Sequence, residues 1–424
     1  MNAGMKPPDT YQGLEFHLNP LRMAYQKLLP ATALAVASTS LRLRNRSNPR
    51  LIQEPNWIAI KPILSGICGS DLSILRARSS PYLAPLVSFP AVLGHEVVGE
   101  VDTENAPWPR GTRVVIDPSI PCQARALTPC PACERGEPDE CSNRHHPELG
   151  AGMLLGYHRD LPGGWSTRMW APVTQVHPIP VAMKTRRAVL AEPSSIVWQA
   201  LSRLKLGDAN PTVLIVGAGT VGLLTLWLFK IKYPAATVAI RARYPLQARL
   251  ATPFGADVVY HDRDDRAFVT SPRLNAVAGE PLPTQWGGWP FRPKGFDIVV
   301  DTVGSSVSFY QAATLVRPGG QILLLGGAGA MHVDLTPIWS RRVTLIGSFG
   351  YGHSSSIPAC TTFDTVVNLL HDTARPVEQL VTHIVPLDHY REALQILDRG
   401  DAIKVAFSQP NPKDASPATG SSAP

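Results

Sequence analysis

Residues that commonly bind zinc occur at three separate places in this chain. Cys68 lies in Gly-Ile-Cys-Gly-Ser-Asp, His95 and Glu96 follow a glycine, and Glu192 lies in Ala-Glu-Pro-Ser-Ser. One thiolate, one imidazole and one carboxylate make a tetrahedral zinc site that keeps its fourth position open. We therefore predict a catalytic zinc on Cys68, His95 and a carboxylate, Glu96 or Glu192. Such an ion lowers the pKa of an alcohol oxygen, and Ser70 is placed to take the alcohol proton.

A second group of zinc-binding residues consists of cysteines alone. Four of the six cysteines lie close together in the sequence: Cys122, Cys130, Cys133 and Cys141. Four thiolates occupy all four coordination positions of a tetrahedral zinc ion and leave none for substrate. They therefore predict a structural zinc that stabilises a loop with little core of its own. Two disulfides are the alternative. We favour metal because no N-terminal signal-peptide pattern is present, which leads us to expect a cytoplasmic protein.

A glycine-rich segment predicts a phosphate-binding turn. A short apolar run ends in Gly-Ala-Gly-Thr-Val-Gly at residues 217–222, and a helical pattern follows. Gly217 permits a tight turn, Gly219 lets the backbone approach a pyrophosphate, and Gly222 allows close packing of strand and helix. The helix opens at Val221, and its free N–H groups attract phosphate. A second strand follows at the expected distance, which favours a dinucleotide site over a turn that binds nothing.

The end of that second strand indicates which cofactor is bound. Residues 240–244 read Ile-Arg-Ala-Arg-Tyr and contain no acid. An acidic side chain there would bond the ribose hydroxyls of NAD and repel a 2′-phosphate. We therefore predict NADP, with Arg243, and Arg241 beside it, pairing with the phosphate. NAD is the alternative if both arginines are ordinary surface residues.

Composition limits the classes of function. With 424 residues and 44% hydrophobic content, the chain is expected to form two globular domains. The net charge of +7 does not predict nucleic-acid binding, because the basic residues are scattered and the cysteine loop is acidic. Arg42, Arg44 and Arg46 form the densest basic cluster, which a solvated strand explains. We expect no membrane partner, because no uncharged apolar run is long enough to span a bilayer.

The chain changes character near its middle. Before Glu192, short alternating apolar runs separated by turn residues predict an antiparallel, turn-rich domain. After it, strands alternate with helices as a parallel α/β sheet requires. Residues 1–30 are expected to be a loosely packed extension with one short helix near 21–29, residues 261–295 to include a surface insertion, and residues 409–424 to be disordered.

These motifs occur in the order found in the zinc-dependent medium-chain dehydrogenase/reductases of the alcohol dehydrogenase superfamily. From about residue 41 to 407 the chain resembles their sorbitol and threonine dehydrogenase branch. The resemblance implies a GroES-like β-rich catalytic domain at 31–190 and 347–408. It also implies a doubly wound Rossmann domain at 191–346, an active site in the cleft between the domains, and a homo-oligomer, dimer or tetramer.

The resemblance also implies roles for individual residues. Glu192 stands at the position of the third zinc ligand, and Glu96 resembles a neighbouring or exchanging carboxylate. Asp71 resembles a residue that orients the His95 ring. Lys404 resembles the basic residue that reaches the cofactor pyrophosphate, although a solvated lysine on a strand is an equally good interpretation.

Two positions depart from the family pattern. Ser73 stands where many relatives have the histidine that ends the proton relay. Cys122 lies farther from Cys130 than in the commonest arrangement. The first departure concerns the outward path of the proton. The second concerns the place of Cys122 in the four-cysteine site.

The predicted function is NADP-preferring, zinc-dependent oxidation of a secondary alcohol, such as a polyol, sugar or amino alcohol, or the reverse reduction of the ketone. Two zinc ions per chain are expected. One alternative is a metal-independent NADPH quinone or enone reductase of the same superfamily, which would lack the catalytic zinc. A more distant alternative is a non-catalytic zinc-ribbon protein that binds nucleic acid.

Overall fold

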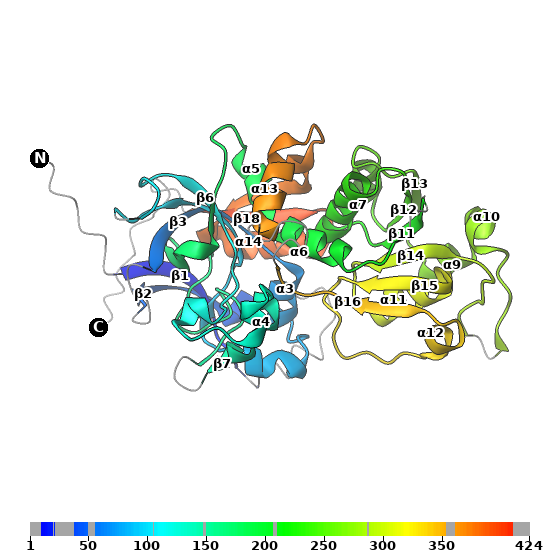
Figure 1. The fold of residues 1–424 in the computed structure, drawn as a ribbon, viewed down its shortest axis with the longest axis horizontal. Coiled ribbons are helices and arrows are strands. Elements are labelled where there is room, and N and C mark those ends of the chain that lie inside the picture. The colour runs from blue at the N-terminus through cyan, green and yellow to red at the C-terminus, as the bar shows by residue number, and fades with distance from the viewer. Residues whose placement is uncertain are drawn as a thin grey trace, which may run out of the picture.

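The computed structural model describes residues 10–19, 21, 38–49, 56–104, 106–146, 150–206, 210–285, 288–352 and 361–409. These residues form two lobes, each built on one large sheet (Figure 1). The lobe at the left of Figure 1 holds a seven-stranded sheet, and the lobe at the right holds a six-stranded one. None of the helices in these ranges is long and apolar enough to cross a membrane.

The left lobe is β-rich and mainly antiparallel. Its seven-stranded sheet runs β10-β6-β5-β3-β18-β17, and β9 pairs with β3. The strands are β3 (Trp57–Gly66), β5 (Glu96–Val101), β6 (Arg113–Ile116), β9 (Met169–Pro172), β10 (Val176–Pro178), β17 (Val381–Pro386) and β18 (Lys404–Ser408). Only β17 and β18 pair in parallel within this sheet. Because β18 pairs with β3, the C-terminal part of the chain returns to the same lobe as residues 57–178.

The right lobe is the predicted doubly wound parallel sheet. Its strands are β11 (Thr212–Val216), β12 (Thr237–Ala242), β13 (Val258–His261), β14 (Phe296–Asp301), β15 (Val316–Leu324) and β16 (Thr344–Gly347). They run in the order β13-β12-β11-β14-β15-β16, and every neighbouring pair is parallel. This order reverses direction between β11 and β14, where ligands bind in such sheets. The predicted α/β fold class is confirmed.

Alternating apolar side chains explain why helices cover both faces of the parallel sheet. Val213 and Ile215 belong to a cluster that contains α7 residues such as Leu223, whereas Leu214 belongs to a cluster with Phe309 of α11. The helices are α3 (Gly69–Leu75), α4 (Pro131–Glu134), α5 (Thr185–Ala188), α6 (Ala191–Ser202), α7 (Thr220–Lys232), α8 (Pro245–Ala251), α9 (Asp265–Thr270), α10 (Asn275–Ala278), α11 (Ser306–Leu315), α12 (Thr336–Ser340), α13 (Thr362–Asp372) and α14 (Tyr390–Arg399). A strand that is buried on both faces must be apolar throughout, as the sequence of β11 is.

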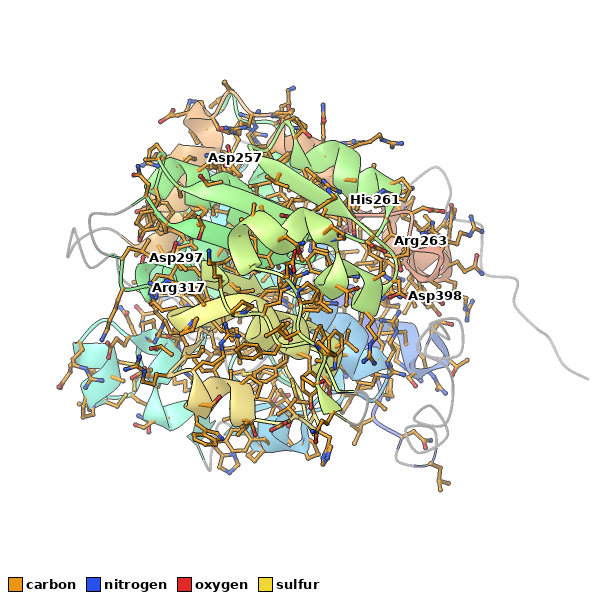
Figure 2. The ribbon with its side chains drawn as sticks, turned by 90° about the vertical axis from the view of Figure 1, so that its right-hand side faces the viewer. Asp257, His261, Arg263, Asp297, Arg317 and Asp398 are labelled. Atoms are coloured by element: carbon orange, nitrogen blue, oxygen red, sulfur yellow. The ribbon has the colours of Figure 1, made fainter. Side chains whose placement is uncertain are left out.

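The two ends of the parallel strands lie on opposite sides of the molecule. Figure 2 shows Asp257, Asp297 and Arg317, at the starts of strands, on one side, and His261 and Arg263, which end and follow β13, on the other. Asp398 of α14, from the β-rich lobe, lies on the same side as His261 and Arg263. At this end of the sheet, Thr220 after β11 donates to the carbonyl oxygen of Ile403 just before β18, so the carboxyl end of β11 contacts the β-rich lobe.

The N-terminal extension is more ordered than the sequence predicts. Strand β1 (Thr10–Phe16) pairs with β2 (Leu41–Ser47) and with β4 (Ala91–Val92), which corrects the expectation of a loosely packed segment over this range. Leu14 and Phe16 are buried in the main core, and the buried carboxylate of Glu15 pairs with Arg46. The partners of β1 lie far away in the sequence, so its own short pattern gave little signal. The predicted helix near 21–29 and the tail beyond residue 409 lie outside the described residues.

The insertion before β14 is fastened by one buried arginine. Arg292 is fully buried, and its guanidinium group donates to the carbonyl oxygens of Val269 and Ser271 and to the side chain of Asn275. These acceptors lie in and around α9 and α10. The segment thus packs against the outer face of the right lobe, away from the sites described below (Figure 1).

Helix α13 is attached to the β-rich lobe by an ion pair that acid should weaken. His177 Nδ1 of β10 lies 2.7 Å from Asp364 Oδ1, and this contact lowers the pKa of Asp364 from 3.8 to about 2. Because the folded-state pKa lies below the ordinary one, the contribution to stability is present above about pH 4 and is lost as the pH falls towards 2.

We expect Asp364→Asn to remove that part of the acid dependence. Urea unfolding between pH 2 and 6 measures the free energy of unfolding of wild type and variant. The two free energies should differ most at the upper end of this range and least near pH 2. Asp372→Asn, which changes an exposed carboxylate on the same helix, is the control. A difference between D364N and wild type that stays constant with pH would contradict the assignment.

Candidate active site

The N-terminus of α3 presents Cys68. Cys68 is the N-cap of the helix, and its backbone N–H donates to Asp71 Oδ2 at 2.9 Å, which completes a capping box. This explains the local Cys-Gly-Ser-Asp sequence: the buried Asp71 fixes the first turn and so directs the thiol. Gly66, two residues earlier, has no room for a side chain, because a Cβ there would lie 1.8 Å from Glu96 Oε2.

The turn before β5 presents His95 and Glu96. Gly94 has φ +96°, and a Cβ at this position would lie 2.3 Å from the Trp165 ring, so glycine is required on both grounds. The turn buries His95 and Glu96 almost completely. Strands β3 and β5 pair so that Gly66 lies opposite Glu96, which brings the Cys68 segment beside them.

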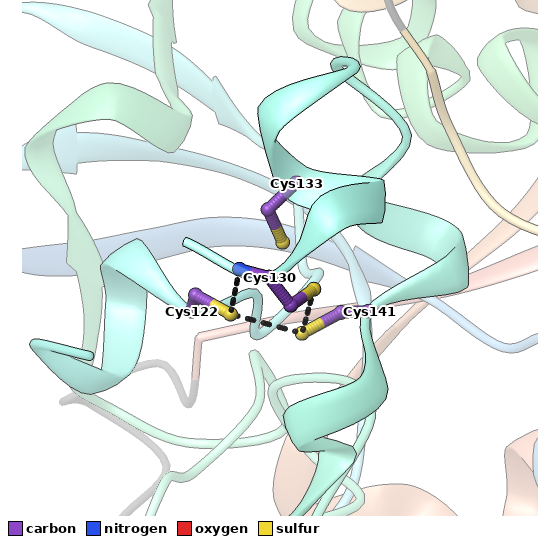
Figure 3. Close-up of side chains that lie close together, drawn as sticks. All are labelled: Cys122, Cys130, Cys133 and Cys141. Carbon is purple, nitrogen blue, oxygen red and sulfur yellow. Dashed lines mark hydrogen bonds between the residues drawn. The ribbon is translucent and has the colours of Figure 1, made fainter. Parts of the chain in front are cut away.

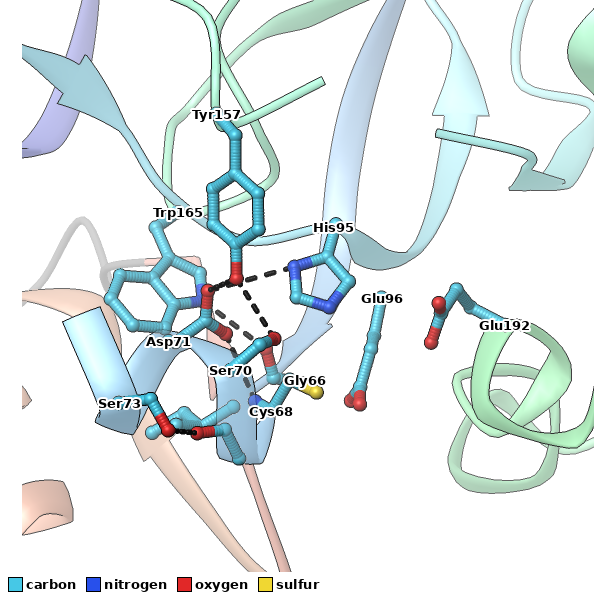
Figure 4. Close-up of polar contacts among 12 residues, drawn as sticks. Gly66, Cys68, Ser70, Asp71, Ser73, His95, Glu96, Tyr157, Trp165 and Glu192 are labelled. Atoms are coloured by element: carbon cyan, nitrogen blue, oxygen red, sulfur yellow. Dashed lines mark hydrogen bonds and ion pairs between the residues drawn. The ribbon is translucent and has the colours of Figure 1, made fainter. Parts of the chain in front are cut away.

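These two segments together form a possible metal site. One ligand atom from each of Cys68, His95 and Glu96 lies within 4.8 Å of the others (Figure 4). The set of sulfur, nitrogen and oxygen donors is the kind that zinc accepts, and it leaves one position for another ligand. The buried Lys404 donates to both carboxylate oxygens of Glu96, at 2.6 and 2.7 Å, and so offsets its charge.

Glu192 faces this group but does not belong to it. Figure 4 shows the Glu192 carboxylate across from Glu96, and the compact trio does not include it. It accepts a hydrogen bond from the buried hydroxyl of Tyr351. Burial, together with the nearby charge of Glu96, raises the pKa of Glu192 from 4.5 to about 7. The described geometry therefore supports Glu96, rather than Glu192, as the third ligand.

Ser70 and Asp71 take part in a network that the sequence did not reveal. The hydroxyl oxygen of Tyr157 lies 2.9 Å from Ser70 Oγ and 3.0 Å from Asp71 Oδ1 (Figure 4). Asp71 Oδ1 also lies 3.5 Å from His95 Nδ1, on the side expected of a residue that orients the ring. No motif marks Tyr157. It reaches Ser70 and Asp71 because it follows Gly156 in the loop between the cysteine cluster and β9.

Two ionisable side chains next to His95 affect its pKa. Burial by itself would lower the pKa of His95, but Asp71 and Cys68 raise it well above its ordinary value of 6.5. Anionic groups thus surround the ring on two sides, an environment that favours a bound cation. A metal ion would replace the proton on the imidazole.

The four clustered cysteines converge as predicted (Figure 3). One sulfur from each of Cys122, Cys130, Cys133 and Cys141 lies within 4.8 Å of the others, and all four are free of disulfides. Cys122 joins the group despite its wider spacing, because η3 (Gln123–Arg125) turns the chain directly after it.

Hydrogen bonds to the sulfur atoms support a metal-binding role for this cluster. The backbone N–H of Cys130 donates to Cys122 Sγ at 3.3 Å, and the side-chain amide of Asn143 donates to the same sulfur at 3.0 Å. Hydrogen bonds from the backbone of Cys133 and from Ser142 lower the pKa of Cys130 from 9.0 to about 5. Such donors stabilise the Cys130 thiolate, the form that binds zinc, whereas burial raises the pKa of Cys133 and Cys141.

The glycine turn has the geometry of a phosphate-binding site. Gly217 has φ +100°, and a Cβ on Gly222 would lie 2.0 Å from the carbonyl oxygen of Gly217, so neither position tolerates a side chain. A Cβ on Gly219 would meet no atom within 4 Å, which leaves open space for a ligand at the start of α7. Val221 lies in the first turn of this helix, as predicted.

The two arginines after the second strand differ in environment. Arg241 is buried, lies 2.7 Å from Asp265 and donates to Gln311, so its charge is already balanced inside the lobe. This structural role does not favour the predicted phosphate contact of Arg241. Arg243 is exposed just beyond β12, and Arg263 is exposed beyond the neighbouring strand β13.

Lys404 also differs from expectation. The prediction places its ammonium group at the cofactor pyrophosphate, whereas the structure places it on Glu96 and on the carbonyl oxygen of Ile67. A buried ammonium ion requires a counter-charge, and Glu96 is the carboxylate beside it. The preceding residue does reach the glycine turn, because Thr220 Oγ1 donates to the carbonyl oxygen of Ile403 at 3.0 Å.

Comparisons with known proteins agree with the fold. Residues 54–181 match the alcohol dehydrogenase GroES-like domain, and residues 220–368 match the zinc-binding dehydrogenase family. The chain is 26% identical to D-arabinitol dehydrogenase 1 of Uromyces fabae over 84% of its own length and 90% of the relative. It is 27% identical to sorbitol dehydrogenase of Arabidopsis thaliana, over 84% of its own length and 89% of the relative.

A solved structure of acetophenone reductase from Geotrichum candidum NBRC 4597 in complex with NAD has the same fold. Its TM-score is 0.69 at 21% identity, covering 96% of this chain and 99% of that one. Together with the matches above, this places the molecule in a class of two-domain oxidoreductases. The chain belongs to the zinc-type medium-chain dehydrogenases of the alcohol dehydrogenase superfamily, in its polyol dehydrogenase branch.

Proposed function

We propose that this enzyme oxidises a secondary alcohol, of the polyol, sugar or amino alcohol class, with NADP, or reduces the corresponding ketone. One observation carries the proposal: a chain of contacts joins the glycine turn to the candidate zinc site. Thr220, at the start of α7, binds the backbone of Ile403, and the next residue, Lys404, binds Glu96. A cofactor on the turn and a metal on the trio would thus lie next to each other, as hydride transfer requires.

Residues of the chain have distinct tasks in this reaction. Cys68, His95 and Glu96 would hold zinc, and Lys404 keeps the Glu96 carboxylate in place. When bound, zinc supplies a positive charge that lowers the pKa of a substrate hydroxyl, and the nicotinamide supplies the hydride acceptor. Ser70 Oγ accepts the hydroxyl proton as its own proton moves into the hydrogen-bond network of Tyr157 and Asp71. The buried walls of the site exclude bulk water, so these charges act in a medium of low dielectric constant.

The experiment that tests the function is a substrate panel. Polyols, sugars and amino alcohols are assayed with NAD and with NADP by following absorbance of the reduced cofactor. We expect oxidation of at least one secondary alcohol, with a higher kcat/KM for NADP. A chain that turns over none of them in either direction would contradict the proposal.

Zinc content separates this function from the metal-independent reductase. Two zinc ions per chain are expected, one on the trio and one on the cysteine cluster. A quinone or enone reductase would hold no zinc or only the cysteine-loop ion. The relatives named as polyol dehydrogenases and the converging trio favour the first function.

The proposed NADP preference depends on Arg243. Exposed arginines at the ends of neighbouring strands, Arg243 and Arg263, provide charge for a 2′-phosphate, and no acid occupies the end of β12. We expect Arg243→Ala to weaken NADPH binding about tenfold or more, as loss of a charge-assisted pair would, and to leave NADH binding nearly unchanged. Fluorescence titration with each cofactor measures this.

Arg249→Ala, which removes an exposed charge on the adjacent helix α8, is the matched control. Equal weakening of NADPH and NADH binding by R243A would contradict recognition of the 2′-phosphate by this residue.

We also propose that the protein assembles with copies of itself. Strand β16 pairs only with β15 among the described residues, so one backbone edge of the sheet is open. Leu345 on this strand and Trp339 in the helix before it are exposed. Open edges with apolar side chains favour pairing with another chain. Light scattering of the purified protein tests the proposal, and a monomer at micromolar concentration would contradict it.

A further inference from the structure

Tyr157 is the polar side chain beside the candidate site that no motif explains. Its ring lies with its centroid 5.2 Å from that of His95, and its hydroxyl is fully enclosed. Gly156, with φ +88°, lies against the Gly94 backbone, where a Cβ on Gly156 would be 3.3 Å from the Gly94 nitrogen, and so Tyr157 follows next to the turn that presents His95.

The direction of the hydrogen bonds around Tyr157 follows from the donors available. Asp71 Oδ2 already accepts from the backbone of Cys68, and its Oδ1 lies 3.0 Å from the Tyr157 oxygen. A carboxylate only accepts, so the single Tyr157 proton points to Asp71. The Ser70 hydroxyl, 2.9 Å from the same tyrosine oxygen, must then be the donor to Tyr157.

The direction of these hydrogen bonds determines the orientation of the Ser70 hydroxyl. With its proton directed towards Tyr157, Ser70 Oγ keeps its lone pairs available as acceptors, and Figure 4 shows Ser70 next to Cys68. As Ser70 Oγ accepts a proton from a substrate alcohol, its own proton moves to the Tyr157 oxygen and the Tyr157 proton moves to Asp71 Oδ1, so that the carboxylate takes up the net proton. Ser73 does not provide an equivalent partner, because its exposed hydroxyl donates to the Gly69 carbonyl oxygen within the helix at 3.0 Å.

We infer that Tyr157 is a positioning residue that holds Ser70 as a proton acceptor for alcohol oxidation. The inference rests on the proposed function, because it assigns Ser70 that role. It adds a residue from the loop between the cysteine cluster and β9 to the site formed by α3 and β5. Tyr157 acts through Ser70 and does not itself contact the substrate.

A double-mutant cycle tests the inference. The variants are Tyr157→Phe, Ser70→Ala and the double variant, assayed with the best alcohol from the substrate panel. We expect Y157F to lower kcat about 10- to 100-fold with KM changed less than about threefold, and S70A to lower kcat at least as much. In the S70A background, Y157F should have almost no further effect on kcat. Independent, additive losses would overturn the inference, because they would show that Tyr157 acts by another route.

Zinc content supplies a readout that does not depend on turnover. We expect Y157F to retain two zinc ions per chain, because the three ligand side chains are untouched. Loss of one ion in Y157F would overturn the inference, since it would make Tyr157 a support of the metal site instead. Tyr390→Phe is the matched control: it removes another buried tyrosine hydroxyl, which lies 3.5 Å from the Leu41 carbonyl oxygen, and should leave kcat unchanged.

The outcomes distinguish this inference from the proposed function. If wild type oxidises no alcohol, the proposed function fails before Tyr157 is tested. If wild type is active and Y157F has the same kcat, only the role of Tyr157 fails.

Discussion

Cys68→Ser is expected to abolish alcohol oxidation, lowering kcat/KM by about 10⁴-fold or more. The thiolate is one of only three ligand side chains in the trio, and replacing it by a hydroxyl removes the donor that binds zinc most strongly. Without a bound cation the substrate hydroxyl keeps its ordinary high pKa, so almost none of it is ionised near neutral pH. Steady-state assays with the best substrate of the panel measure the loss.

Cofactor binding should survive this substitution. The glycine turn at the start of α7 belongs to the other lobe, whereas Cys68 caps α3 in the β-rich lobe. NADPH titration should therefore give a Kd within about twofold of wild type, while metal analysis shows one zinc ion per chain instead of two. Wild-type turnover in C68S would remove the proposed mechanism altogether.

Cys360→Ser is the control for the chemistry of the substitution. Cys360 is the one cysteine that stands apart from both predicted sites in the sequence. Retention of both zinc ions and of full activity is expected for C360S. Loss of a zinc ion from this variant would mean that the assignment of ligands is wrong.

Cys141→Ser is expected to cost the protein its other zinc ion and the order of the cysteine loop. Cys141 is buried, and its sulfur lies 3.5 Å from Cys122 Sγ and 4.0 Å from Cys130 Sγ. The cluster has few apolar residues around it, so metal binding, worth about 10–16 kcal/mol in small zinc domains, supplies most of its stability. Metal analysis should give one zinc per chain, and limited trypsin digestion should cut at Arg135 or Arg144 far faster than in wild type.

The effect of C141S should extend beyond the loop. Asp139, within it, lies 3.4 Å from Arg203 at the end of α6, and its side chain fills the space beside Gly350, where the chain returns from the right lobe. We therefore expect reduced turnover together with a lower melting temperature. Chelation of zinc from wild type should reproduce the trypsin sensitivity, and a C141S protein as resistant as wild type would exclude a structural zinc.

Predictions based on one short stretch of sequence agreed well with the structure. The apolar run of β11 predicts a buried strand, because a strand buried on both faces requires apolar residues. The glycines after it predict a tight turn, because a positive φ favours glycine. The antiparallel strands β5 and β6 and the helices α7, α8 and α11 likewise have patterns contained within each element. The parallel sheet follows from their alternation, whereas its doubly wound order was implied by the family resemblance.

Predictions that depend on distant partners were less accurate. The strand β1 gains its partners β2 and β4 from elsewhere in the chain, so its short pattern alone indicated a loose extension. Arg241 looks like a phosphate ligand in sequence, but its carboxylate partner Asp265 and its amide partner Gln311 come from other elements. Tyr157 has no motif, because its role exists only once a loop folds back over α3.

The sequence by itself determined the chemistry available to this protein: a thiol, an imidazole and carboxylates for one zinc ion, four thiols for another, and a glycine turn for a dinucleotide. Residue type fixes which atoms can bind a metal or a phosphate, and this does not depend on the fold. Only the tertiary structure decided which carboxylate joins Cys68 and His95, because Lys404 holds Glu96 beside them while Tyr351 holds Glu192. Distances between side chains from different elements are set by packing of the whole chain, and no local pattern contains them.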